Sequence, residues 1–275
     1  MSGGAVSPVA PVVGDLHRFL ALSWTLAVTE WKLRFYGSVL GYVWQLVRPF
    51  AFFGVIYVVF TQVIDLGDQI KNYGVYILFG LVLFTFFSEV TTSCLHSLVA
   101  RENLLRKMSF PRLAIPFSVT LTGLFNLGGT LAAVFVFAIA SGVYPTTGWL
   151  ELPLLILLLA LLSSGVGMLL SVLYVRFRDV EPIWDVITQA LFYASPVLYV
   201  TTLVPECCQR PYVAQPIAAI LTEMRHAVVD SGAPDIVESI GGAGRLLIPL
   251  AVILAAFVLG LWMFNREAPR IAEHL

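Results

Sequence analysis

Residues 152–175 read LPLLILLLALLSSGVGMLLSVLYV and contain no Asp, Glu, Lys or Arg. A helix of roughly 20 apolar residues crosses the hydrocarbon core of a bilayer, about 30 Å thick. Five more uncharged runs lie at 49–64, 72–88, 113–150, 186–205 and 246–265. The run at 49–64 is short, but it extends back through 39–47 with only Arg48 interrupting. The sequence therefore predicts an all-α polytopic membrane protein with six transmembrane helices.

The composition and the distribution of charge agree with this fold class. Of the 275 residues, 59% are hydrophobic and 12% are charged, whereas a soluble domain carries about 25% charged residues. Six spans place both termini on one side, together with twelve of the sixteen Lys and Arg residues. The positive-inside rule then predicts that both termini are cytoplasmic. The net charge of −1 indicates no nucleic-acid partner.

The first 36 residues divide into two parts. Residues 1–14 are rich in Gly, Pro, Ser and Val and lack a basic signal-peptide region, so we expect a disordered cytoplasmic N-terminus. Residues 15–36 are predicted to form an amphipathic helix lying in the membrane interface. Its apolar positions recur at helical spacing: Leu16, Phe19, Leu20, Trp24, Ala27, Val28 and Trp31. Gly37 and Gly41 then allow a bend into the six-span domain, residues 37–265.

The connections between the spans carry the remaining signals. Residues 99–112 form a short, basic, amphipathic segment that suits a docking surface, and 266–275 is a short cytoplasmic tail. Residues 203–230 hold an amphipathic helix that begins at Pro216 and is too polar to span. Pro196 should kink or stop the fifth span, 183–200, near the outer surface.

Two polar residues and three cysteines fall inside or beside the spans. Glu89 is either a functional intramembrane carboxylate or the ion-pair partner of Arg101 or Arg106. Asn126 is expected to make a hydrogen bond between helices. Cys94 should be a small core residue, whereas Cys207 and Cys208 lie where oxidation is possible.

The chain lacks the common catalytic and metal-binding motifs. No Walker A loop, G-x-S-x-G, H-E-x-x-H or C-x-x-C is present, so we expect no catalytic residue, no metal and no cofactor in this chain. A proton-driven carrier would place ionisable residues at the span centres, which are nearly bare. A membrane-bound glycosyl- or phosphotransferase would need clustered acidic residues, and the acidic residues here are dispersed.

Five motifs in fixed order give the sequence a family resemblance. They are RFYGSVLGYVWQLVRP, RENLLRKMSFPR, VRFRDVEP, ASPVLY and QPIAAILTEMRHAV. Over residues ~15–270 the chain resembles the permease subunit of ABC-2-type polysaccharide exporters, which handle O-antigen, teichoic acid or cell-wall galactan. One departure is Gln215-Pro216, where the family often has Asn-Pro; the side-chain amide is kept.

The resemblance implies an architecture and partners that the residues alone do not. It implies an ABC-2 permease fold of the type V exporter kind, a homodimer, and two copies of a separate ATP-binding subunit that hold ATP and Mg. The complex would move a polysaccharide, linked through pyrophosphate to a polyprenyl lipid, across the bacterial inner membrane. An ABC-2 drug or lipid exporter and a membrane-bound transferase are the alternatives.

The resemblance also suggests roles for individual residues. The segment 99–112 resembles a coupling helix, with Glu102, Arg106, Lys107 and Phe110 contacting the ATPase, and 203–230 resembles re-entrant helices. Aromatic residues would line the substrate conduit, unless they form a lipid-facing belt: Tyr42, Trp44, Phe52, Tyr57, Phe60, Trp184, Phe192, Tyr193 and Tyr199. Lys32, Arg34 and Arg48 would form the entrance, where Arg34 and Arg48 receive the pyrophosphate. Alternatively, these three side chains only extend their charged ends to the membrane surface and fix the topology of the chain.

Overall fold

A computed structural model of the chain describes residues 12–35, 39–64, 70–101 and 111–274. Throughout these ranges the regular structure is helical and no strand occurs. The predicted ATPase contacts Glu102, Arg106, Lys107 and Phe110 lie outside the described residues. The side chains of Tyr42 and Cys207 also lie outside them.

Five helices in the described ranges are long and apolar enough to cross a membrane. They are α2 (Val39–Val58) with the π-helical turn η1 (Val59–Val63), α3 (Tyr73–Ala100), α5 (Ala114–Ala140), α6 (Leu152–Arg176) preceded by η2 (Thr147–Glu151), and α11 (Leu247–His274). They correspond to the predicted spans one, two, three, four and six. Helix α11 runs on through 266–274, which the sequence analysis assigned to a tail.

The predicted fifth span, 183–200, differs from the expectation of six long helices. Helix α7 (Val180–Ala194) has 15 residues, which is about 22 Å of helix. It ends at Ala194 because Pro196 lacks an N–H and disfavours helical backbone in Ser195. The predicted interruption at Pro196 is therefore confirmed, and residues 195–200 continue without regular helix.

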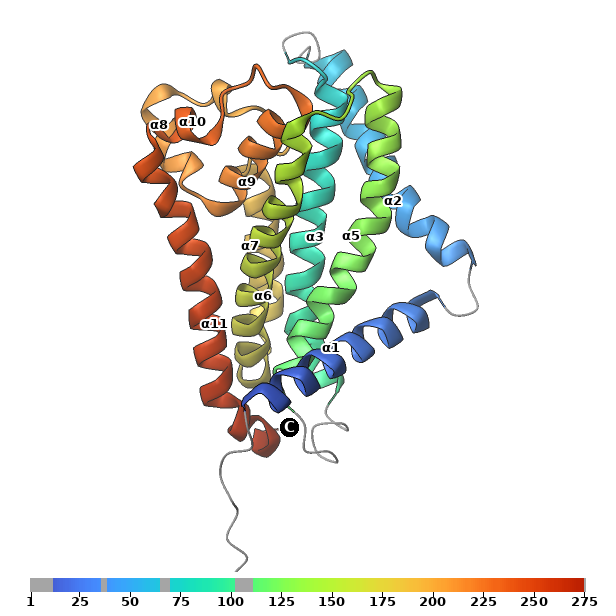
Figure 1. Cartoon of the computed structure of the whole chain (residues 1–275), viewed down its shortest axis with the longest axis vertical. Coiled ribbons are helices and arrows are strands. Elements are labelled where there is room, and N and C mark those ends of the chain that lie inside the picture. The colour runs from blue at the N-terminus through green and yellow to red at the C-terminus, as the bar shows by residue number, and fades with distance from the viewer. Residues whose placement is uncertain (1–11, 36–38, 65–69, 102–110, 275) are drawn as a thin grey trace, which may run out of the picture.

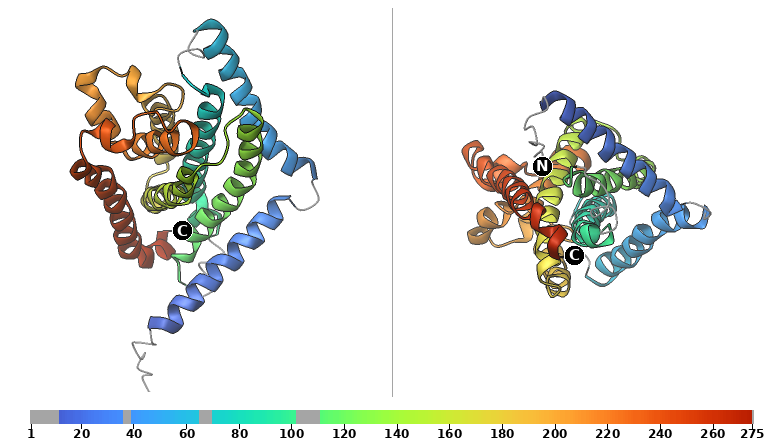
Figure 2. Two further views of the ribbon diagram at one scale, coloured as in Figure 1. Left: turned by 45° about the horizontal axis from the view of Figure 1, so that its top comes forward. Right: turned by 90° about the horizontal axis from the view of Figure 1, so that it is seen from below.

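Helix α3 forms the centre of the bundle. It packs against α5 and α6 along its length and against α2 and α7 at its sides, and the view from below shows it surrounded by other helices (Figure 2). Helix α11 packs on α6 at two glycines. A Cβ atom added to Gly260 would lie 2.3 Å from the carbonyl oxygen of Gly165, so the two backbones touch here.

Helix α1 (Val12–Phe35) crosses the lower end of the bundle obliquely, whereas the long helices stand upright (Figure 1). It packs on α5 through aromatic pairs: the ring centroids of Phe19 and Phe117 lie 5.3 Å apart, and those of Trp24 and Phe125 lie 5.2 Å apart. The helix begins at Val12, three residues before the predicted start. Its position in a membrane interface stays a prediction.

The opposite end of the bundle is capped by short helices (Figure 1). They are η3 (Thr201–Leu203), α8 (Glu206–Val213), α9 (Pro216–Met224), the π-turn η4 (Arg225–Val229), α10 (Ile236–Ile240) and η5 (Ala243–Leu246). Helix α9 begins at Pro216 as predicted and is buried along its apolar stripe. Trp149 Nε1 donates to the Val228 carbonyl at 3.3 Å, which ties this cap to the start of α6.

Candidate functional site

A cavity of about 720 Å³ opens between α1, α2, α3 and α5, with one residue contributed by α7. Arg34 comes from the last turn of α1, Arg48 from α2 and Glu89 from α3. Five aromatic residues complete the wall: Trp44, Phe52, Phe84, Phe86 and Phe192. The two arginines that the sequence analysis placed at an entrance therefore meet at one cavity, although they come from different helices.

Two smaller cavities adjoin this one. A cavity of about 420 Å³ shares Arg34, Glu89, Gly123 and Asn126 with it. A cavity of about 540 Å³ on the other side shares Arg48 and Phe52 with it, among other residues, and adds Tyr193 and Asp185 from α7. The three cavities thus follow one another, with shared lining residues, from α1 past α2 and α3 to α7.

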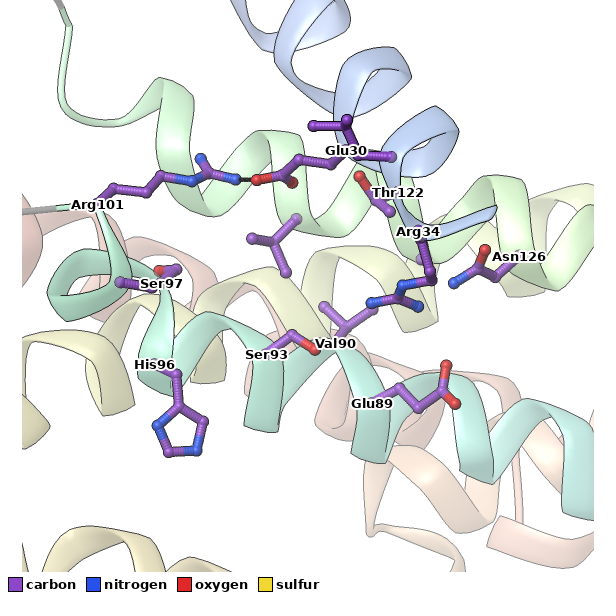
Figure 3. A pocket seen from close by; sticks show the side chains of 14 residues that line it. Glu30, Arg34, Glu89, Val90, Ser93, His96, Ser97, Arg101, Thr122 and Asn126 are labelled. Atoms are coloured by element: carbon purple, nitrogen blue, oxygen red, sulfur yellow. Dashed lines mark ion pairs between the residues drawn. The ribbon is translucent and has the colours of Figure 1, made fainter. Parts of the chain in front are cut away.

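The charges at the cavity lie near one another without forming close ion pairs. Arg34 and Arg48 are near enough to Glu89 for both positive charges to act on its carboxylate. Within the described ranges, none of these three side chains has an ion-pair partner within 4.0 Å. Figure 3 shows Arg34 and Glu89 on facing walls. The two guanidinium groups therefore keep their donors available for a ligand's oxygens.

The proposed pair between Glu89 and Arg101 was wrong, because Arg101 binds elsewhere. Arg101 forms an ion pair with Glu30 of α1 and donates a hydrogen bond to Ser118 Oγ at 3.0 Å (Figure 3). Glu30 and Arg34 stand one helical turn apart on the same face of α1. Burial lowers the pKa of the Arg101 guanidinium, yet an arginine stays charged in proteins. Arg106, the other candidate partner, lies outside the described residues.

Three buried oxygen atoms beside the cavities lack hydrogen-bond partners in the described part of the chain. They are Gln45 Oε1, Asn126 Oδ1 and Thr188 Oγ1. Gln45 and Asn126 line the 720 Å³ cavity, and Thr188 lines the one next to α7. The expected interhelical hydrogen bond of Asn126 is thus not made by this oxygen. The sequence analysis missed Gln45, although it lies in the quoted motif between Trp44 and Arg48.

The predicted conduit aromatics fall into two groups. Trp44, Phe52 and Phe192 line the 720 Å³ cavity, and Tyr193 lines its neighbour; Trp44 is 65% exposed and Tyr193 is 63% exposed. The Phe192 ring lies 6.3 Å from that of Phe52 and 5.3 Å from that of Tyr193, measured between centroids. These three rings form a connected surface, and Trp44 lines the same cavity as two of them.

The remaining aromatics line neither the 720 Å³ cavity nor the 540 Å³ cavity beside α7. Trp184 is 8% exposed and donates from Nε1 to Thr91 Oγ1 at 3.2 Å, as a core residue does. Tyr57 lines a separate cavity of about 900 Å³, and Phe60 packs against the core. Tyr199 accepts a hydrogen bond from Tyr212 in the capping helices at 3.0 Å. Lys32 is exposed and lines none of these cavities.

The described residues offer no site for a metal ion, since no three His, Cys, Asp or Glu side chains gather among them. Cys94 is buried, as predicted. The 720 Å³ cavity presents two guanidinium groups, one carboxylate, amides, hydroxyls and aromatic rings. Such a set binds a ligand by charge, hydrogen bonds and stacking.

Residues 21–228 match the family of ABC-2 type transporters. The chain belongs to this family. The matched range includes every residue named around the three cavities, from Glu30 to Tyr193. The ABC-2 assignment therefore covers the site and the long helices of the bundle other than α11.

Curated relatives of the chain share most of its length. It is 30% identical over 246 residues to the O-antigen export system permease protein RfbA of Klebsiella pneumoniae, covering 89% of this chain and 91% of that protein. It is 27% identical over 270 residues to the protein of that name from Myxococcus xanthus, covering 96% and 99%. It is 22% identical over 205 residues to the polysialic acid transport protein KpsM of Escherichia coli, covering 74% and 80%.

Proposed function

We propose that this chain is the transmembrane subunit of an ATP-driven exporter that moves a polysaccharide attached through pyrophosphate to a polyprenyl lipid. The observation that carries the proposal is the meeting of Arg34 and Arg48, from different helices, at a cavity lined by Trp44, Phe52 and Phe192. Guanidinium groups suit phosphate oxygens, and aromatic faces suit the C–H faces of sugar rings. The relatives' names, O-antigen export and polysialic acid transport, support a polysaccharide as cargo.

The assembly is a homodimer of this chain with two copies of a separate ATP-binding subunit. That subunit holds ATP and Mg and supplies the hydrolysis, so this chain acts as a permease and not as an enzyme. The segment 99–112 acts as the coupling helix, with Glu102, Arg106, Lys107 and Phe110 at its contact. Its basic, amphipathic composition between α3 and α5 supports this role.

The chain crosses the bacterial inner membrane six times, with both termini in the cytoplasm. The fifth crossing in chain order consists of α7 and residues 195–200, which continue beyond the helix in turns. Tyr73 of α3 donates a hydrogen bond to the Leu198 carbonyl at 2.6 Å, which holds this segment against the bundle. Two observations support an even number of crossings. The start of α1 and the end of α11 lie at the same end of the bundle, and twelve of sixteen Lys and Arg residues fall on the side assigned to the cytoplasm. Residues 203–230 form the re-entrant closure at the other end.

Deletion of the gene and complementation with arginine variants test the proposal. A deletion strain should accumulate a lipid-linked glycan in the cytoplasm, and the wild-type chain should clear it. The double variant Arg34→Ala/Arg48→Ala should not clear it. The double variant Arg34→Lys/Arg48→Lys keeps the positive charges that fix the topology but loses the planar guanidinium groups. This variant should clear the glycan partly. Arg176→Ala, an exposed arginine away from the cavities, is the matched control.

Each outcome separates one part of the proposal from the rest. A deletion strain without accumulated glycan would favour the alternative of a drug or lipid exporter. If an Arg34→Ala/Arg48→Ala protein inserts normally and exports at the wild-type rate, the pyrophosphate site is refuted. The assignment of a polysaccharide as cargo is not affected by that result.

A further inference from the structure

The 720 Å³ cavity contains hydrogen-bonding groups that the proposed pyrophosphate contact leaves unused. Gln45 Oε1 on α2 and Asn126 Oδ1 on α5 are buried and have no partner in the described part of the chain. Asn126 is only 6% exposed. A buried acceptor without a partner destabilises a fold, and an apolar side chain of the same shape would avoid that loss. Two such acceptors on one cavity wall indicate that a ligand completes them.

Other buried polar groups on α5 are satisfied within the helix, which sets Asn126 apart. The hydroxyls of Thr120 and Thr130 donate to backbone carbonyls one turn earlier, both at 3.1 Å. Asn126 lines both the 720 Å³ and the 420 Å³ cavities, and Figure 3 shows its side chain beside Arg34. Its amide can therefore reach the part of a ligand that is adjacent to a group bound by Arg34.

The chemistry of the wall defines what the ligand must bring. Arg34 and Arg48 have donors only and pair with phosphate oxygens. The oxygens of Gln45, Asn126 and Glu89 are acceptors and need O–H or N–H donors. An ionised pyrophosphate has no donors, and a polyprenyl tail has neither donors nor acceptors. The donors must come from a sugar, through its hydroxyl groups or an acetamido N–H.

We propose that Gln45 and Asn126 form a sugar subsite that distinguishes the glycosylated carrier lipid from the bare carrier. The subsite binds the sugar next to the pyrophosphate, while Arg34 and Arg48 hold the pyrophosphate itself; in this the inference rests on the proposed function. The bare carrier satisfies the arginines but leaves both amides without a donor. A site whose buried polar groups stay unpaired rejects the ligand that lacks the matching group.

A binding experiment on the full-length protein in lipid nanodiscs tests this subsite. The probes are polyprenyl pyrophosphate carrying a single N-acetylglucosamine and bare polyprenyl pyrophosphate of the same chain length. The wild-type protein should bind the glycosylated probe about tenfold or more tightly than the bare one. Asn126→Leu and Gln45→Leu should each remove most of this preference and leave the bare probe's affinity within about twofold. Thr120→Val, a buried polar residue of α5 outside the cavities, should keep the preference.

Thermal unfolding of the same variants separates a binding role from a structural one. Asn126→Leu should leave the midpoint unchanged or raise it, because the residue replaced has an unsatisfied acceptor. A lowered midpoint together with equal losses for both probes would assign Asn126 to helix packing and overturn the subsite.

The arginine variants make failure of the subsite distinguishable from failure of the proposed function. Arg34→Ala/Arg48→Ala should weaken both probes alike. Equal binding of the two probes by the wild type, with both lost in the arginine variant, would overturn the sugar subsite and retain the pyrophosphate site. A wild-type protein that binds neither probe would refute the proposed function and the subsite with it.

Discussion

In the ion pair between Glu30 and Arg101, the burial of each side chain predicts which of the two charges is more costly to remove for the stability of the protein. Arg101 is 11% exposed and Glu30 is 35% exposed. Breaking a buried pair by removing one partner costs about 3–5 kcal/mol, because the other charge is left buried, whereas exposed pairs contribute about 0–1 kcal/mol. Glu30→Gln leaves the more buried charge behind. Because the bond from Arg101 to Ser118 remains, we expect a loss of about 1–3 kcal/mol.

The reverse change should be milder, and this asymmetry is the core of the prediction. Arg101→Met keeps the apolar stem of the side chain and leaves Glu30, which is more exposed and is hydrated more easily. We expect Arg101→Met to lower the free energy of unfolding by about 1 kcal/mol or less. A double variant, Glu30→Arg with Arg101→Glu, should recover part of the loss caused by either single charge change.

These differences in the free energy of unfolding are measured by unfolding the protein in mixed detergent, with the fluorescence of the tryptophans on α1 as the signal. The pair of Lys71 and Asp230 is the control, since its Nζ–Oδ1 distance is 3.2 Å and removal of the Asp230 charge leaves Lys71, which is 70% exposed. Asp230→Asn should cost less than about 1 kcal/mol. If Arg101→Met cost more than Glu30→Gln, or if Asp230→Asn cost as much as Glu30→Gln, the reasoning from burial would be refuted.

Three further changes test other parts of the structure. Gly260→Ala should separate α6 from α11 and destabilise the protein by about 2 kcal/mol or more in a thermal assay, because the new Cβ would meet backbone at 2.3 Å; Gly128→Ala, with open space around it, should be neutral or stabilising by up to about 1 kcal/mol. Burial raises the pKa of Glu223 above its unfolded-state value, against the hydrogen bond it accepts from backbone, so stability should fall as pH rises from the ordinary carboxyl range through that raised pKa. Glu223→Gln should therefore stabilise the protein at pH 7 and change its stability little near pH 4, and an equal effect of the substitution at both pH values would contradict this. Reversing the charges of Arg106 and Lys107 should uncouple ATP hydrolysis from export without unfolding the protein, and unchanged export with unchanged ATPase co-purification would rule that out.

Five spans and the amphipathic helix could be predicted from the sequence because their signals are local. An uncharged run of bilayer length and a 3.6-residue period depend on neighbouring residues alone. The fifth span was harder, since 186–205 has the right composition but Pro196 ends the helix at Ala194. Composition does not report where backbone hydrogen bonds stop.

The part of the site whose residues are close together in the sequence could be predicted. Arg34, Arg48 and Trp44 belong to one short motif, so their meeting at a cavity follows from the bend between two helices. Glu89 and Phe192 come from α3 and α7, and only the packing of the bundle brings them to the same wall. The partner of Arg101 was misjudged because Glu30 is far away in sequence but adjacent in space.

Unsatisfied atoms are the feature that sequence reasoning is least able to find. Asn126 and Thr130 lie on the same helix in the same apolar run, and either reads as a polar residue that fastens two helices. The Thr130 hydroxyl donates a hydrogen bond to the backbone of its own helix, whereas the Asn126 side-chain oxygen has no hydrogen-bond partner in the described part of the chain. The unsatisfied Asn126 atom is an amide oxygen, which only accepts hydrogen bonds, so it cannot bond to a carbonyl of the preceding turn as a threonine hydroxyl does. The difference between a structural residue and a candidate binding residue therefore depends on whether a donor comes within reach of that oxygen, and this becomes visible only when the helices are assembled.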